Sequence, residues 1–146
     1  MFKHILIPTD GSPVSNKAAK AGIALARALG AKVTGYCAIE EPQPLYTEGY
    51  AFDQEVIDGI EKRVRGVGQK QVDAIGKIAK AAGVPFASVV TKAFTAYEGI
   101  IDAAKKQKCD VIFMASHGRR GLSKLIMGSV TQKVLTHSKI PVVVYR

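Results

Sequence analysis

The chain alternates between two kinds of hydrophobic pattern. Short runs of consecutive apolar residues recur five times, and between them lie longer stretches in which apolar residues return every three or four positions. The short runs are typical of strands buried on both faces, and the spaced pattern is typical of amphipathic helices. The predicted strands cover residues 3–9, 32–39, 86–92, 110–116 and 140–145. The predicted helices cover residues 13–29, 53–82, 97–107 and 129–137.

Local signals mark the ends of the first two helices. Ser12 is a favourable N-cap, and Pro13 suits the first helical position because an N–H there would have no partner within the helix. Gly30 follows the last apolar position of the first helix, where glycine is common. Gly83 and Pro85 end the second helix. Each predicted helix is therefore a separate element between two strands.

This order of strands and helices predicts the fold. Strands separated by helices run parallel through right-handed crossovers, and a sheet of such strands needs helices on both faces. We therefore expect a doubly wound α/β domain of the Rossmann-like type, with a five-stranded, mostly parallel sheet. A single domain spanning residues 1–146 accommodates the whole pattern.

Two segments lack a clear pattern of this kind. Residues 40–52 contain two prolines and several aromatic residues, and a connection of this length in a compact domain is often functional. Its aromatic side chains either cover a ligand or pack against the following helix, and packing is the more common role for loop aromatics. Residues 122–127 are predicted to form a brief helical turn.

Composition and cysteine spacing indicate a cytoplasmic globular protein. No apolar run approaches the roughly 20 residues that span a bilayer. The N-terminus lacks the long apolar segment and cleavage site of a signal peptide, so we expect a cytoplasmic location and no membrane partner. Cys37 and Cys109 lie far apart without metal or redox spacing. Both are expected to be reduced thiols near the core.

The net charge of +9 favours anionic ligands such as nucleotides. The basic residues are nevertheless spread over the predicted helices, and no basic block is interleaved with aromatic residues. Specific binding of nucleic acid is therefore not expected.

The strongest candidate chemistry lies in residues 114–130. This stretch follows a predicted strand, contains Gly118, Gly128 and Ser129, and ends where a helix begins. Glycines let backbone amides approach an anion closely, and a helix N-terminus attracts negative charge. Asp10 follows the first strand, and parallel strands end at the same edge of the sheet. The sequence therefore predicts a phosphate-binding crevice that includes Asp10.

Four motifs carry a resemblance to a known family. They are Ile7-Pro8-Thr9-Asp10-Gly11-Ser12, Ser116-His117-Gly118-Arg119-Arg120-Gly121, Gly128-Ser129-Val130 and Ile140-Pro141-Val142-Val143-Val144. Through them the chain resembles the universal stress protein family over essentially its whole length. The nucleotide-binding branch of that family has Gly, two residues, Gly, nine residues, then Gly and Ser or Thr. The chain matches this pattern at Gly118, Gly128 and Ser129, but has Ala115 at the position of the first glycine.

The resemblance implies a site for ATP, ADP or AMP. Asp10, in its setting beside Pro8 and Thr9, would lie near the sugar and phosphates and would bind the Mg²⁺ of the nucleotide. The backbone at Ala38 would bond the adenine edge. The ribose would be flanked by Met114 and Ala115, and the phosphates would be held by Gly118, Gly128, Ser129 and Val130, with Thr131 close by.

The resemblance also implies a homodimer formed through residues 140–145 and a regulatory role in the stress response. One alternative is a dimeric interaction protein that works without nucleotide. Another is a slow ATPase or autophosphorylating protein, with Ser129 or Thr131 as the acceptor. Efficient phosphoryl transfer needs a placed base and several charge-stabilising groups. Asp10 is the one ready metal ligand, so we expect no enzymatic activity.

Several of these residues also have a purely structural interpretation. Asp10 could form only an Asx turn, and Ser129 could serve only as a helix N-cap. His117 is expected to fix its loop through hydrogen bonds rather than act as a base. Ala115 continues an apolar strand, so we expect extended backbone there, where the alanine methyl group causes no strain.

Overall fold

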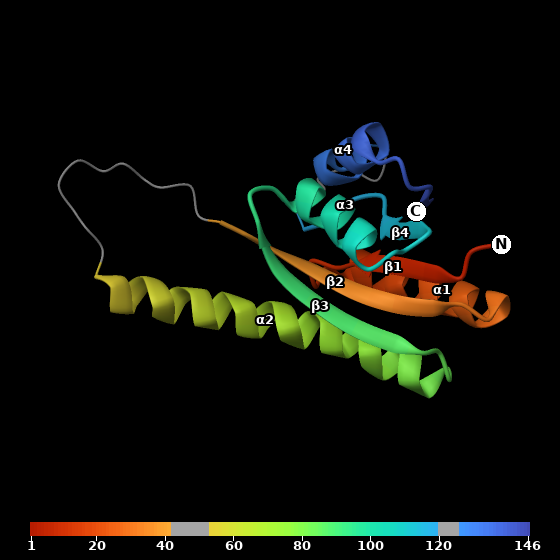
Figure 1. The fold of residues 1–146 in the computed structure, drawn as a ribbon, viewed down its shortest axis with the longest axis horizontal. Helices are drawn as coiled ribbons and strands as arrows, with labels where there is room; N and C mark the ends of the chain where they lie inside the picture. The colour runs from red at the N-terminus through yellow and green to blue at the C-terminus, as the bar shows by residue number, and fades with distance from the viewer. Residues whose placement is uncertain (42–52, 120–125) are drawn as a thin grey trace.

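The computed structural model describes residues 1–41, 53–119 and 126–146, and in them five strands alternate with four helices (Figure 1). The strands are β1 (His4–Pro8), β2 (Lys32–Glu40), β3 (Phe86–Ala93), β4 (Val111–Ala115) and β5 (Val142–Tyr145). The helices are α1 (Pro13–Leu29), α2 (Gln54–Ala81), α3 (Ala96–Lys106) and α4 (Ser129–His137).

The five strands form one sheet in the order β3-β2-β1-β4-β5. Every pairing between neighbouring strands in this sheet is parallel. The chain winds from β1 outward to β3, then returns to the other side of β1 and continues through β4 to β5. The predicted doubly wound α/β fold is therefore confirmed, with the winding reversing between β1 and β4.

The helices cover both faces of the sheet. On one face, Ile23 of α1 and Ile75 of α2 are buried in a cluster with Ile5. On the other face, Ile100 of α3 belongs to a second cluster that includes Leu6. Ile5 and Leu6 lie in different clusters because successive side chains of a strand point to opposite faces. Burial on both faces explains why the strands are continuous apolar runs.

α1 begins and ends where the sequence signals indicate. The hydroxyl of Ser12 accepts a hydrogen bond from the backbone N–H of Ser15 at 3.2 Å, and Pro13 is the first helical residue. Gly30 caps the other end with φ of 64°, a left-handed conformation that glycine adopts without strain. The predicted caps of α1 are confirmed.

α2 is buried along only part of its length. Gly68, Val72, Ile75 and Ala79 are its buried residues, and all lie in its C-terminal half. Figure 1 shows the N-terminal half extending past the sheet. In the described part of the chain no helix, α2 included, combines the length and apolar character needed to cross a membrane.

Two predicted segments differ from the structure or lie outside it. The last strand begins at Val142 rather than at residue 140. The Ser138 hydroxyl accepts from the N–H of Ile140 and donates to its carbonyl, so this residue belongs to a turn, and Pro141 has no N–H to donate. The predicted irregular segment and the predicted helical turn fall largely on residues 42–52 and 120–125, outside the described residues.

Candidate functional site

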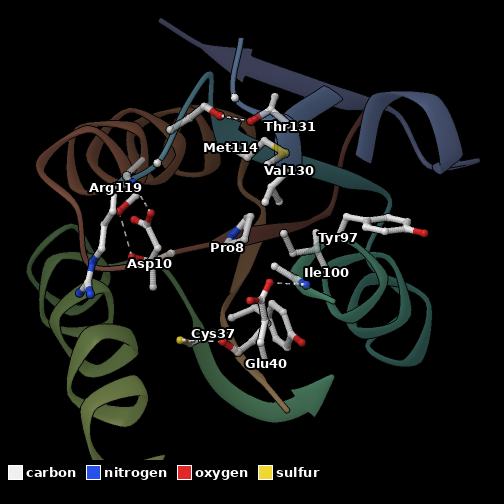
Figure 2. Close-up of a pocket in the computed structure, with 18 of the residues that line it drawn as sticks. Pro8, Asp10, Cys37, Glu40, Tyr97, Ile100, Met114, Arg119, Val130 and Thr131 are labelled. Carbon is white, nitrogen blue, oxygen red and sulfur yellow. Dashed lines mark hydrogen bonds between the residues drawn. The ribbon is translucent and has the colours of Figure 1, made fainter. Parts of the chain in front are cut away.

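A cleft of about 660 Å³ opens at the carboxyl ends of the central strands. It lies where the winding of the sheet reverses, which is where doubly wound folds bind ligands. Figure 2 shows Asp10 and Arg119 on one side of this cleft and Tyr97 and Ile100 on the other. Every site residue predicted from the sequence lines it: Pro8, Thr9, Asp10, Ala38, Met114, Ala115, Gly118, Gly128, Ser129, Val130 and Thr131.

Asp10 links two segments that are far apart in the sequence. Its Oδ1 accepts from the backbone N–H of Ser12 at 2.9 Å, which forms an Asx turn at the start of α1. Its Oδ2 accepts from the backbone N–H of Arg119 at 2.9 Å, in the loop after β4. The Asx turn is therefore present, but it is not the only role of Asp10, because the same carboxylate also holds the glycine-containing loop.

The surroundings of Asp10 keep its carboxylate charged. Partial burial alone would raise the pKa of Asp10, but hydrogen bonds from Ser12, Arg119 and Ser15 favour the ionised form and outweigh it. The net result is a pKa below its ordinary value. The cleft therefore contains a fixed negative charge at neutral pH, beside backbone N–H groups.

Gly118 is required where the loop passes over Asp10. A Cβ atom on Gly118 would collide with the Oδ2 atom of Asp10. A larger residue would therefore push this carboxylate away from the N–H of Arg119. Gly118 is needed here for the close approach of the two segments.

A backbone hydrogen bond holds the two ends of the loop after β4 together. The N–H of Gly128 donates to the carbonyl of Ser116 at 2.8 Å, and a Cβ on Gly128 would lie 3.0 Å from the Cα of His117. His117 hydrogen-bonds through Nδ1 to the Ser116 hydroxyl at 3.0 Å, in line with the predicted loop-fixing role. These backbone contacts thus fix the position at which α4 begins.

α4 begins at Ser129 with Gly128 as its N-cap, so the interpretation of Ser129 as the N-cap is wrong. A glycine cap offers no side-chain acceptor, and no side chain caps α4 among the described residues. The first N–H groups of a helix have no partner within the helix. At α4 these groups, which belong to Ser129, Val130 and Thr131, lie along the cleft.

The hydroxyl of Thr131 makes a hydrogen bond within the protein. It donates to the carbonyl of Ala115 at 2.9 Å, and Thr131 is 2% exposed. This bond fixes the first turn of α4 against the end of β4. Thr131 lines the cleft, but its hydroxyl is engaged by the protein. Of the two hydroxyls considered as phosphate acceptors, Ser129 is the exposed one.

The other end of the cleft is mainly apolar. Ala38 of β2, Met114 of β4 and Val130 of α4 line it, together with Ile100 of α3. Glu40 closes the start of α3, where its Oε1 accepts from the N–H of Ala96 at 3.1 Å. The cleft therefore joins a polar end, lined by Asp10 and the first turn of α4, to a mainly apolar end.

Comparisons with known proteins identify one family. A sequence model of the universal stress protein family matches residues 1–146. The chain belongs to the universal stress protein family. Universal stress protein MJ0531 of Methanocaldococcus jannaschii is 32% identical over 146 residues, covering 100% of this chain and 83% of that protein. A universal stress protein of Thermus aquaticus is 32% identical over 146 residues and 100% of both chains.

Solved structures of the family share the fold. MJ0577 from M. jannaschii superposes with a TM-score of 0.83 at 26% identity, covering 99% of this chain and 95% of that chain. A universal stress protein crystallised in complex with cAMP has a TM-score of 0.72 at 22% identity, covering 99% and 97%. One from Archaeoglobus fulgidus in complex with dAMP has a TM-score of 0.63 at 16% identity, covering 100% and 98%.

Ala115 replaces the first glycine of the family's nucleotide motif without strain. It is the last residue of β4, pairs with Tyr145 of β5, and is 7% exposed. Among described non-glycine residues, Lys108 is the one with positive φ, so Ala115 has ordinary strand backbone. The expectation of extended backbone is confirmed. The substitution therefore adds one methyl group to the cleft wall.

Sequence reasoning missed several cleft residues that the helices contribute. Val64, Val67 and Gln71 of α2 and Tyr97 of α3 line the cleft, as does Lys133 of α4. The position of α3 offered a signal, because a helix that follows a parallel strand starts at the carboxyl edge. For α2 no such signal exists, since the face that overlaps the cleft depends on how the helix crosses the sheet.

The cysteines are free and buried, as expected. Cys37 lines the cleft, and its Sγ lies 3.5 Å from Oε1 of Gln71. Burial, with the nearby charge of Asp10, raises the pKa of Cys37, and burial raises the pKa of Cys109 to about 11. Both thiols therefore stay protonated and poorly nucleophilic at neutral pH. Among the described residues no group of three or more His, Cys, Asp or Glu could hold a metal.

Proposed function

We propose that the cleft binds an adenine nucleotide, with its phosphates at the N-terminus of α4. The observation that carries this proposal is the first turn of α4, which has a glycine cap and opens into the cleft beside a pinned glycine-containing loop. Unpaired N–H groups and the positive end of a helix dipole favour phosphate oxygens. The nucleotide is the ligand through which this universal stress protein would regulate a partner.

The apolar end of the cleft suits the adenine ring. Ala38, Met114, Val130 and Ile100 offer a surface for a flat ring, and the exposed ends of the β2 backbone offer hydrogen bonds to its edge. The ribose then lies near Ala115, between the two ends. Two proteins of the same fold were crystallised in complex with cAMP and dAMP, both adenine nucleotides, which supports this choice of base.

Asp10 suits the role of a single protein ligand to the Mg²⁺ of the nucleotide. Its oxygens accept the backbone N–H groups of Ser12 and Arg119, and its lowered pKa leaves it ionised at neutral pH. Mg²⁺ usually takes one or two carboxylates, with phosphates and water completing the shell. When bound, the ion would neutralise phosphate charge next to this carboxylate.

Isothermal titration of the purified chain with ATP and Mg²⁺ tests the proposal. We expect saturable binding of one nucleotide per chain. Adenosine is the matched ligand, because it keeps the base and sugar but lacks the phosphates, and it should bind at least about tenfold more weakly. An absence of ATP binding at two temperatures would contradict the proposal and favour a role without nucleotide.

We propose binding without rapid turnover. The carboxylates among the described lining residues are those of Asp10 and Glu40, and each already bonds a backbone N–H. Phosphoryl transfer needs a placed base in addition to a metal ion and charge stabilisers. A phosphate-release assay checks this expectation, and steady multiple turnover would overturn it.

We propose that the regulatory unit is a homodimer formed through β5. This strand is an edge of the sheet, so one side of its backbone is free to pair with a second copy. Amide hydrogen exchange tests the contact directly. Amides of residues 142–145 that face away from β4 should exchange slowly at high protein concentration and rapidly on dilution. Rapid exchange at every concentration would contradict this contact.

A further inference from the structure

A groove of about 520 Å³ lies between α1 and α2 and is open to solvent. Its floor is apolar, because Ile23 of α1 is buried and Ile78 and Ala82 of α2 are half-buried. These three side chains belong to the core cluster under the helices or pack against it, which holds the floor in place. The groove shares no described lining residue with the cleft at the carboxyl ends of the strands. It is therefore a separate, preformed surface, which we call the α1–α2 groove.

The wall of the α1–α2 groove on the α1 side is cationic. Lys20 and Arg27 line it, together with Ala24 and Ala28, and all four residues are exposed. Lys20 and Arg27 are seven residues apart, so they lie on the same side of α1, about 10 Å apart along its axis. The helix dipole favours a cation in the last turn of α1, where Arg27 lies, but it does not favour Lys20. Helix stability therefore does not explain this pair of charges.

The cations around the α1–α2 groove outnumber the acids. α1 contains three cations and no acid. The half of α2 that carries its buried residues, 68–81, contains three cations and one acid, Asp73. Among the described residues the structure pairs Lys92 with Glu61, and it pairs no cation of these two segments with a carboxylate. The positive charge beside the groove therefore has no acidic partner within the described part of the chain.

We propose that the α1–α2 groove binds an amphipathic helix of a partner protein that carries carboxylates seven residues apart. A helix laid along α1 presents the same side after every two turns, so two such carboxylates reach Lys20 and Arg27 together. Its apolar stripe then packs on Ile78 and Ala82, in the way that amphipathic helices bind apolar grooves. Opposite charge at a matched spacing selects this partner and fixes its register.

The apolar floor favours a protein helix over a phosphate polymer. The phosphates of a nucleic acid would also attract Lys20 and Arg27, but a sugar–phosphate backbone brings no apolar surface to the floor. Proteins that bind single strands supply aromatic side chains on which bases stack, and no described lining residue of the groove is aromatic. A membrane surface is too broad to enter a groove between two helices. A helix both covers the floor and meets the two charges.

Fluorescence anisotropy of the full chain without nucleotide tests this contact independently of the proposed function. The probe is a labelled three-heptad helical peptide with leucine and alanine at the a and d positions and glutamate at the e and g positions. The floor and two cations form a small interface, so we expect saturable binding in the micromolar range. A matched peptide with glutamine in place of glutamate should bind at least about tenfold more weakly.

Removal of the two wall cations tests the charge contact. K20Q/R27Q should lower the affinity for the glutamate peptide at least about tenfold. The control is K105Q/K106Q, which removes two exposed cations of α3, on the other face of the sheet, and changes the net charge equally. This control should change the affinity by less than about threefold. All four side chains are exposed, so each variant should keep the fold, which its thermal unfolding midpoint checks.

A neutral substitution in the wall tests whether the peptide occupies the groove itself. Ala24→Gln adds bulk without charge and should lower the affinity for the glutamate peptide about tenfold. Ala81→Gln is the control, because it adds the same side chain at an exposed position of α2 that does not line the groove. The control should leave the affinity unchanged. A polyanion held by charge alone would not distinguish these two variants.

Three results would overturn the proposal. One is an absence of saturable binding of the glutamate peptide. Another is an equal affinity in K20Q/R27Q and K105Q/K106Q, or in Ala24→Gln and Ala81→Gln, which would mean that the peptide does not occupy the groove. The last is tighter binding of short duplex DNA, or of vesicles that contain phosphatidylserine, with a loss in K20Q/R27Q. That result would mean that phosphate groups, rather than a protein helix, are the partner of these cations.

Discussion

Two helices, α1 and α4, begin at the same edge of the sheet, but their N-termini are capped differently. α1 starts after β1, and its N-terminus is closed by the Ser12 hydroxyl and by Pro13, which has no N–H. α4 starts near the end of β4, and its cap is Gly128, without a side-chain acceptor among the described residues. Both helices lie beside the switch point of the sheet, so position alone does not distinguish them.

The difference teaches which helix terminus is available to a ligand. α2 and α3 resemble α1, because Asp53 accepts from the N–H of Glu55, and Glu40 accepts from the N–H of Ala96. The protein thus supplies its own acceptor at α1, α2 and α3. At α4 no side chain of the described residues supplies such an acceptor, and Asp10 bridges the start of α1 to the loop that leads there.

Gly128→Asp should make α4 resemble a capped helix. The added carboxylate would occupy the phosphate position and repel it, which at surface dielectric corresponds to roughly 1–4 kcal/mol. We expect affinity for ATP to fall by about a hundredfold, measured by isothermal titration. Thr136→Asp is the matched control, since it adds the same charge on an exposed position of α4 away from the cleft. Equal losses in both variants would contradict the special role of the α4 terminus.

Gly118→Ala should break the bridge between the two helix starts. The new methyl group collides with Oδ2 of Asp10, so the bond to the N–H of Arg119 is lost. We expect affinity for ATP to fall by about tenfold. Gly59→Ala is the control, because a Cβ there meets open space, and it should stabilise α2 by roughly 1 kcal/mol without changing affinity. Unchanged affinity in Gly118→Ala would show that the bridge is not needed.

Ser12→Ala should open the N-terminus of α1 without creating a nucleotide site. Loss of this cap should lower the free energy of unfolding by about 1 kcal/mol, measured by urea denaturation. Affinity for ATP should change by less than about threefold, because α1 retains Pro13 and its own first turn. A tenfold loss of affinity with unchanged stability would reverse the roles assigned to α1 and α4.

Asp10→Asn should have an effect on stability that depends on pH. The pKa of Asp10 in the folded chain lies below its ordinary value of 3.8, so on acidification the unfolded chain takes up this proton first. The stabilisation by Asp10 is therefore complete above about pH 4 and is lost as the pH falls through the folded pKa. Unfolding free energies of the wild type and the variant should converge in acid. A difference that stays constant down to pH 3 would contradict this.

The fold could be predicted because its signals are local. Ser12, Pro13 and Gly30 set the ends of α1, and the apolar runs set the sheet. The start of β5 could not be predicted as well, since Ile140 is apolar and its place in a turn depends on the Ser138 hydroxyl. Periodicity identifies elements, whereas side-chain hydrogen bonds decide some of their ends.

The residues of the candidate site likewise divide into those that the sequence could predict and those that it could not. Residues directly after strands, such as Asp10 and Gly118, could be predicted because parallel strands end together. Val64, Val67 and Gln71 could not, because the way α2 crosses the sheet decides which of its faces reaches the cleft. The hydroxyl of Thr131 likewise faces Ala115, a direction that the sequence does not reveal.

The most direct test of the central claim is a titration of the ¹⁵N-labelled chain with ATP and Mg²⁺, followed by amide NMR. If phosphate oxygens accept from the open terminus of α4, the amide protons of Ser129, Val130 and Thr131 should move downfield and become protected from exchange. The amides of Ser15 and Asn16 in the closed first turn of α1 should shift much less. Saturable binding that leaves the α4 amides unchanged would contradict the account.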